Sequence, residues 1–243
     1  GYLKRLYSDS LVSFNKIFVQ SHNDLKRIEI LSNIRAEYIG NLKLTYNNKI
    51  DQNNKKKFSI MIASSHDPEE KIIINQIKEI VKNKKLKICI APRHPERINN
   101  ISKLLDDNNF SYSLDSEEKN YNNDVVLIDS FGNLDKYFDN SDVVILGGSF
   151  ISKGGHNPIE PAKFGCAIIS GIHVYNWQNI YDDMALNQAC IMINDINDLK
   201  TKLDELIINN VLLKNAKKKA LDFSNKNFFD NENLFNEINL VLN

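Results

Sequence analysis

Three segments that follow apolar runs carry residue types suited to binding an anion. They are residues 92–95 (Pro-Arg-His-Pro), 129–134 (Asp-Ser-Phe-Gly-Asn-Leu) and 147–161, which opens with Gly-Gly-Ser-Phe and continues into Gly-Gly-His-Asn-Pro-Ile-Glu-Pro. An arginine can clamp a phosphate through its planar guanidinium group. Glycines let the backbone approach a ligand and present N–H groups to it. These residue types together favour a ligand that carries a phosphate.

The tetrapeptide 157–160 has the composition of a helix start. Asn157 suits the N-cap, Pro158 the first helical position and Glu160 the N3 position. Two interpretations stay open. The tetrapeptide is an ordinary capping box, or it is a phosphate site at a helix N-terminus whose Glu160 carboxylate also accepts two ribose hydroxyls. The glycine pairs 147–148 and 154–155 favour the second interpretation.

Arg93 and the histidines also have structural alternatives. Arg93 is a phosphate clamp, or a surface arginine paired with Glu96 or Asp129. His94 and His156 are expected to hold loops by hydrogen bonds rather than to act as acids or bases. The histidines lack the spacing of a zinc site, and the three cysteines lie in apolar runs without a CxxC pair, so no metal is expected.

The elements that must position these residues alternate between short apolar runs and helical patterns, which predicts an α/β domain with a parallel sheet. The expected strands are 58–63, 86–91, 125–128, 142–146, 167–170 and 189–193. The expected helices are one that opens within 64–70 and runs to about 82, and then 96–106, 134–138, 158–164, 177–187, 197–209 and 211–224. The three segments thus follow strand ends, and in open α/β sheets ligands bind beyond the carboxyl ends of the strands.

A second unit precedes this sheet. Residues 16–20 form an expected strand and 24–31 a helix, and a further strand follows near 38–39. The polar residues 46–57 are the best linker candidate. The basic run 55–57 is a solvated face or, less favoured, a membrane contact. We therefore predict a doubly wound domain over 58–225, the tail end of another Rossmann-like domain before it, and a terminal amphipathic helix within 226–243.

Composition bounds the function. Lys plus Arg and Asp plus Glu both number 31, so the formal net charge is zero and no nucleic-acid partner is expected. The hydrophobic content of 42% suffices for a core. The sequence has no apolar stretch near the ~20 residues that span a bilayer.

Several motifs resemble those of one family. The loop 147–160 closely resembles the signature loop of bacterial 3-deoxy-D-manno-octulosonic acid (Kdo) transferases. Residues 92–97 are similar to a second family motif, 63–66 with 69–70 to a third, 40–43 to a fourth, and 171–177 to the loop after the next strand. Their order and rough spacing agree along nearly the whole chain.

The resemblance implies a GT-B glycosyltransferase with two Rossmann-like domains and the active site between them. The implied CMP contacts are Pro92, Arg93, Phe131, Gly132, Asn133, Asn157, Pro158, Ile159 and Glu160. The implied supporting loop residues are Gly147, Gly148, Ser149, Gly154, Gly155 and His156. Segment 131–133 departs from the family pattern, which often has Met before the glycine and Glu after it. Lys43 matches a lysine proposed to stabilise the transition state, although by itself it would be a solvent-facing loop lysine.

The implied reaction is direct transfer of Kdo from CMP-Kdo to a lipid A precursor, without metal or cofactor, with a carboxylate as general base. That base belongs to the N-terminal domain, so we expect this chain to be a fragment that is inactive alone. Residues 1–45 would be the end of that acceptor domain, 46–57 the linker, 58–225 the donor-binding domain and 226–243 a helix packing back toward the N-terminal domain. The implied location is the cytoplasmic face of the bacterial inner membrane, reached through the N-terminal domain. Two alternatives stay open, a GT-B enzyme using a UDP-sugar and a non-catalytic nucleotide-binding module.

Overall fold

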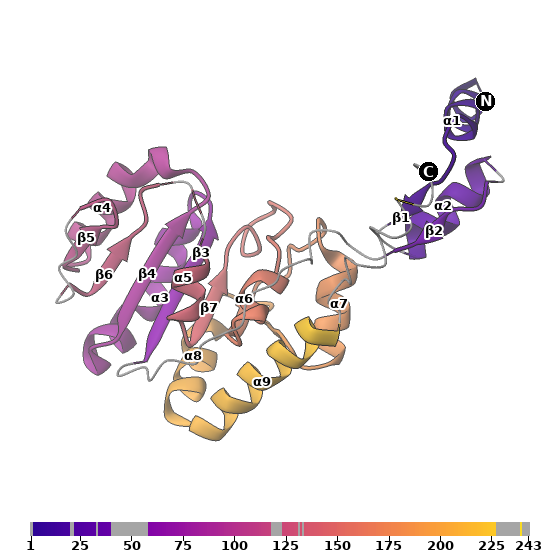
Figure 1. The fold of residues 1–243 in the computed structure, drawn as a ribbon. Helices are drawn as coiled ribbons and strands as arrows, with labels where there is room; N and C mark the ends of the chain where they lie inside the picture. The colour runs from indigo at the N-terminus through magenta and orange to yellow at the C-terminus, as the bar shows by residue number, and fades with distance from the viewer. Residues whose placement is uncertain are drawn as a thin grey trace. The chain divides into compact units, whose positions relative to one another are not determined.

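The computed structural model describes residues 2–19, 22–32, 34–39, 58–117, 123–130, 132, 134–226 and 239. These residues fold into two compact units (Figure 1). One unit holds the described residues up to 39, and the other holds those from 58 to 226. The predicted boundaries at 45 and 57 lie outside the described residues, as does most of the predicted terminal helix, so this division stays a prediction.

The first unit is a small parallel strand-helix-strand. Its elements are α1 (Tyr2–Val12), β1 (Phe18–Val19), α2 (His22–Ser32) and β2 (Glu37–Tyr38). Strand β1 pairs in parallel with β2, in agreement with the predicted strand, helix and strand. Helix α1 was not predicted, because apolar side chains such as Leu6, Tyr7 and Val12 are exposed and give no single buried stripe.

The second unit is built on a seven-stranded, entirely parallel sheet in the order β5-β6-β4-β3-β7-β8-β9. The strands are β3 (Ser59–Ser65), β4 (Lys87–Pro92), β5 (Tyr112–Leu114), β6 (Val125–Leu127), β7 (Val143–Leu146), β8 (Ala167–Ser170) and β9 (Ile191–Met192). The helices are α3 (Glu69–Lys84), the 3-10 turn η2 (Pro95–Arg97), α4 (Ile98–Asp107), α5 (Asp135–Asp139), α6 (Ile159–Lys163), α7 (Gln178–Leu186), α8 (Asp198–Ile208) and α9 (Asn210–Lys226). The predicted doubly wound α/β class is confirmed.

Helix α3 shows how the sequence builds this core. Ile73, Ile74 and Ile77 recur at helical spacing, are fully buried, and belong to the same core cluster as the sheet strands and α8. Burying one such side chain stabilises the fold by roughly 1.5–3 kcal/mol. The helix ends at Lys84. The next residue, Lys85, has a left-handed backbone, and its N–H faces the carbonyls of Val81 and Lys82.

The strand order creates a topological switch point between β3 and β7. From β3 the chain proceeds to β4 on one side, whereas from β7 it proceeds to β8 on the other. The loops that leave these two adjacent strands therefore diverge, and ligands of doubly wound folds bind at such a point.

Gly147 makes the close approach at this point possible. Its N–H donates to the carbonyl of Ala63 at 2.8 Å. A Cβ at position 147 would lie 2.5 Å from the Cα of Ser65 and 2.6 Å from the carbonyl oxygen of Ser64. These contacts are with backbone atoms, which cannot rotate away as a side chain does.

We predict that Gly147→Ala lowers the free energy of unfolding by at least about 2 kcal/mol, because the added methyl group overpacks two backbones. Gly132→Ala is the matched control, since a Cβ there meets nothing within 4 Å. The control should change the stability by less than about 0.5 kcal/mol. Urea denaturation of both variants checks this, and equal stabilities would contradict the close approach.

Candidate functional site

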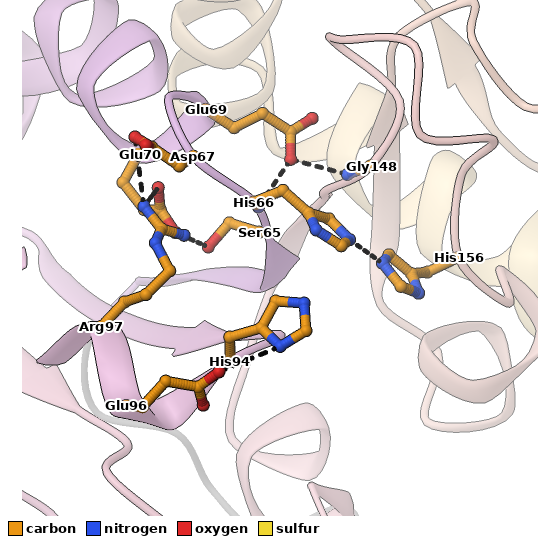
Figure 2. Close-up of polar contacts among 10 residues, drawn as sticks. All are labelled: Ser65, His66, Asp67, Glu69, Glu70, His94, Glu96, Arg97, Gly148 and His156. Atoms are coloured by element: carbon orange, nitrogen blue, oxygen red, sulfur yellow. Dashed lines mark hydrogen bonds and ion pairs between the residues drawn. The ribbon is translucent and has the colours of Figure 1, made fainter.

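The ends of β4, β3 and β7 are neighbours, so the loops that follow them meet at one edge of the sheet (Figure 2). The three loops are residues 93–97, 66–68 and 147–158. Two of the three segments expected to bind an anion therefore lie together. The turn between β3 and α3 lies at the same edge, between these two segments.

The Glu69 carboxylate ties the loop after β7 to the start of α3. Its Oε2 accepts the backbone N–H of Gly148 at 2.7 Å and that of His66 at 2.9 Å, and its Oε1 accepts that of Phe150 at 3.0 Å. The side chain is completely buried, and burial raises the pKa of Glu69 against the opposing effect of the three N–H groups. The loop conformation thus depends on one buried acceptor.

Glu70 performs the corresponding role toward the loop after β4. Arg97 donates two N–H bonds to it, from Nη1 to Oε1 at 2.9 Å and from Nη2 to Oε2 at 3.0 Å. The hydroxyl of Ser65 donates to Oε1 at 2.8 Å, and Arg97 also lies 3.3 Å from Asp67 (Figure 2). A bidentate pair of this kind fixes geometry more than it adds net stability.

Two histidines from different loops contact each other at the centre of the edge. Nε2 of His66 lies 3.0 Å from Nε2 of His156, and their rings are nearly parallel (Figure 2). Burial, and then the charges of His66, Arg93 and His94, lower the pKa of His156 to about 4. Burial also lowers the pKa of His66. The surroundings therefore favour the uncharged form of both rings.

Asn157 and Glu160 adopt a different arrangement from a capping box. The Asn157 Oδ1 accepts the N–H of Ile159 at 3.1 Å, and its Nδ2 donates to Oε1 of Glu160 at 3.1 Å. Helix α6 begins at Ile159, so Glu160 is its second residue, and the prediction that Glu160 occupies N3 is wrong by one position. In a capping box the Glu160 carboxylate would accept the backbone N–H of Asn157, whereas here it accepts the side-chain amide of that residue.

The Glu160 carboxylate remains available to a ligand. The residue is exposed. The surrounding protein nevertheless raises the pKa of Glu160 by desolvation, against the hydrogen bond from Asn157. Helix α6 has only five residues, so its dipole gives an anion little of the support that the sequence suggested.

Arg93 is an exposed cation at the same edge. Its backbone N–H donates to the carbonyl of Ser65 at 2.9 Å. In the part of the chain that the structure describes, its guanidinium forms no ion pair. Glu96 faces His94 at 3.4 Å, and Asp129 accepts the N–H of Ser116. Arg93 is close enough to His156 and Glu160 to lower the pKa of each. The structure therefore does not support the alternative that Arg93 pairs with Glu96 or Asp129.

The glycine loop is held on its other side by Ser149. Its buried hydroxyl donates to the carbonyl of Leu146 at 2.6 Å and accepts the N–H of Gly171 at 2.9 Å. Gly154 and Gly155 both have positive φ, and a Cβ at Gly154 would lie 2.2 Å from the Asn176 side chain. These residues shape the loop rather than present side chains.

The remaining predicted residues divide into two groups. Pro92 is buried at the end of β4, Ile159 is buried in α6, and Gly132 is exposed. Lys43, Phe131 and Asn133 lie outside the described residues. Among the described residues, no group of three His, Cys, Asp or Glu side chains could hold a metal ion.

Comparison with known proteins relates the chain to one named group, although no family model matches it. It is 33% identical to the 3-deoxy-D-manno-octulosonic acid transferase of Rickettsia felis over 92% of this chain and 51% of that protein. It is 30% identical to that of Aquifex aeolicus over 80% of this chain and 54% of that protein. The chain thus spans about half the length of these relatives.

A solved structure supports the same relationship. The C-terminal CMP-Kdo binding domain of WaaA from Acinetobacter baumannii matches with a TM-score of 0.65 and 25% identity, covering 70% of this chain and 90% of that one. A glycosyltransferase from Rickettsia africae shares the fold at a TM-score of 0.61 and 15% identity, covering 99% of this chain and 66% of that one.

We predict that Glu69→Gln destabilises the protein by about 1–3 kcal/mol. An amide has one acceptor oxygen, so its NH₂ group would face at least one of the three backbone N–H donors. The exposed Glu79→Gln on the same helix is the control and should have little effect on stability. Thermal denaturation measures both, and an unchanged melting temperature in Glu69→Gln would contradict the role of the carboxylate.

Proposed function

We propose that the chain forms the donor-binding part of a glycosyltransferase. Nearly its whole length is homologous to a segment that makes up about half the length of the Kdo transferases it matches. The complete enzyme would transfer Kdo from CMP-Kdo to a lipid A precursor. The observation that carries the proposal is the edge at the β3–β7 switch point. There Arg93, which forms no ion pair with the residues that the structure describes, lies near the exposed carboxylate of Glu160.

CMP would contact the two ends of this edge by different chemistry. The Arg93 guanidinium donates to phosphate oxygens, while the Glu160 carboxylate accepts ribose hydroxyls. Asn157 holds Glu160 in place through its amide. Ile159 has a buried side chain, so it and the neighbouring Pro158 would contact the nucleotide through the backbone. Pro92 and the segment 131–133 complete the proposed contacts.

The proposed reaction is a direct displacement at the anomeric carbon of Kdo. An acceptor hydroxyl attacks this carbon, a carboxylate of the acceptor domain takes its proton, and CMP leaves with the bonding electron pair. The positive side chains at the edge, chiefly Arg93, stabilise the departing phosphate. Lys43 is proposed to assist in the transition state.

The division of the chain follows the same proposal. Residues 58–225 would bind the donor, 1–45 would belong to the acceptor domain, 46–57 would link them, and 226–243 would form a helix that packs toward the acceptor domain. The lipid acceptor would place the enzyme at the cytoplasmic face of the bacterial inner membrane. The helices that the structure describes are too short or too polar to cross a bilayer.

We predict that the chain binds CMP at least about tenfold more tightly than UMP or GMP. A site that accepts a hydrogen bond from the cytosine amino group places the same acceptor against the uracil carbonyl, which has no hydrogen to donate. Isothermal titration calorimetry with the three nucleotides measures this preference. Tighter binding of UMP would favour the UDP-sugar alternative, and no binding of any nucleotide would end the proposal.

Arg93→Ala and Glu160→Gln should each weaken CMP binding by roughly 10- to 100-fold, because each removes a charge-assisted hydrogen bond worth about 1.5–3 kcal/mol. Lys202→Ala and Glu205→Gln, which alter an ion pair at the surface of α8, are matched controls and should bind CMP normally. If Glu160→Gln melts earlier than the wild type but binds CMP normally, Glu160 serves the local structure alone.

A further inference from the structure

The contact between His66 and His156 has no part in the nucleotide contacts proposed above. The two rings come from the loops after adjacent strands β3 and β7, and their Nε2 atoms are 3.0 Å apart. A nitrogen-to-nitrogen hydrogen bond of this length needs one hydrogen between the two atoms. One ring therefore carries its hydrogen on Nε2, and the other ring, with a bare Nε2, carries its hydrogen on Nδ1.

This geometry limits the charge of the pair. A proton added to the bare Nδ1 of the donating ring leaves the Nε2 contact intact and gives the pair one positive charge. A second added proton would place two N–H groups face to face. The pair can therefore alternate between neutral and singly charged states without moving.

Burial favours the neutral pair, and positive groups close to it act in the same direction. Arg93 and His94 follow β4, and Lys153 belongs to the loop after β7. Neither Arg93 nor Lys153 forms an ion pair with any residue that the structure describes.

The nearby carboxylates are already engaged. Glu69 accepts three backbone N–H groups, Glu70 is paired with Arg97, and Glu96 faces His94. Only Glu70 raises the pKa of His66, whereas burial and the cations lower it. An anion placed against these cations would oppose these effects and raise the pKa of the pair, because a nearby negative charge favours the charged form of histidine.

We propose that the His66–His156 pair takes up one proton from solvent when the phosphate of CMP binds at this edge, and so acts as a second cation beside Arg93. The proposal rests on the proposed function. In the transfer, the phosphodiester of the donor becomes the phosphomonoester CMP, which carries one more negative charge near neutral pH. A proton taken up by the pair offsets that additional charge while CMP is bound.

Calorimetry of CMP binding at about pH 7, repeated in buffers of different ionisation enthalpy, counts the protons exchanged. We expect an uptake approaching about one proton per CMP. Since the phosphate of CMP can only release a proton when it binds to cations at this pH, the uptake has the opposite sign and does not come from the phosphate. Cytidine, which lacks the phosphate, should produce no uptake.

The variants assign the proton to the pair. His156→Asn and, independently, His66→Asn should bind CMP with no uptake, whereas the control His173→Asn should retain it. Nuclear magnetic resonance of the histidine ring signals provides a second measurement, because the pKa values of His66 and His156 should rise when CMP is added. Circular dichroism identifies a variant that fails to fold, and the other variant then decides.

The two proposals fail in different ways. CMP binding by the wild type without proton uptake, or an uptake that persists in both pair variants, overturns the proton-binding role and leaves the proposed function intact. Absence of CMP binding by the wild type overturns the proposed function and, with it, this inference.

Discussion

The functional edge depends on a buried carboxylate that accepts three backbone N–H groups. Glu69 bonds to Gly148 and Phe150, which are 79 and 81 positions away in the sequence, as well as to the nearby His66. Burying a charge costs several kcal/mol unless hydrogen bonds replace its hydration. A carboxylate suits this position because it has two acceptor oxygens and no hydrogen to clash with the donors. The hydrogen bonds that stabilise the buried carboxylate thus also fix the conformation of the loop.

The next residue, Glu70, fixes a third loop in the same way, by accepting hydrogen bonds from it. Glu69 and Glu70 are consecutive in the first turn of α3, and consecutive helical side chains point about 100° apart. One carboxylate therefore reaches the loop after β7, while the other reaches Arg97 after β4. Two adjacent residues hold both neighbouring loops relative to β3. This explains how three segments that are distant in sequence keep a common geometry.

The sequence predicts the sheet better than it predicts these contacts. Strand β7 was predicted because Val143–Leu146 is a continuous apolar run, buried on both faces. Strand β5 was missed because Tyr112–Leu114 is a short edge strand with a serine at its centre. The segments that meet at the edge were found from their residue types, but the roles of Glu69, Arg97 and His66 were not, because they depend on the order β4-β3-β7. The paired carboxylates after a strand end were the available signal. Lys43, Phe131 and Asn133 stay predictions.

The electrostatic balance of the edge explains why it suits an anion. Its buried carboxylates are saturated by internal donors, whereas Arg93 and Lys153 form no ion pair within the described residues. Burial and the nearby cations lower the pKa of His66 and of His156 and favour the neutral pair, which is the basis of the proposed proton uptake. Glu160 differs from Glu69 and Glu70 because it is exposed and, among the described residues, it accepts a hydrogen bond from Asn157 alone. Donors for a phosphate and an acceptor for hydroxyls therefore occupy the same edge, and a nucleotide that satisfies both can bind in only one orientation.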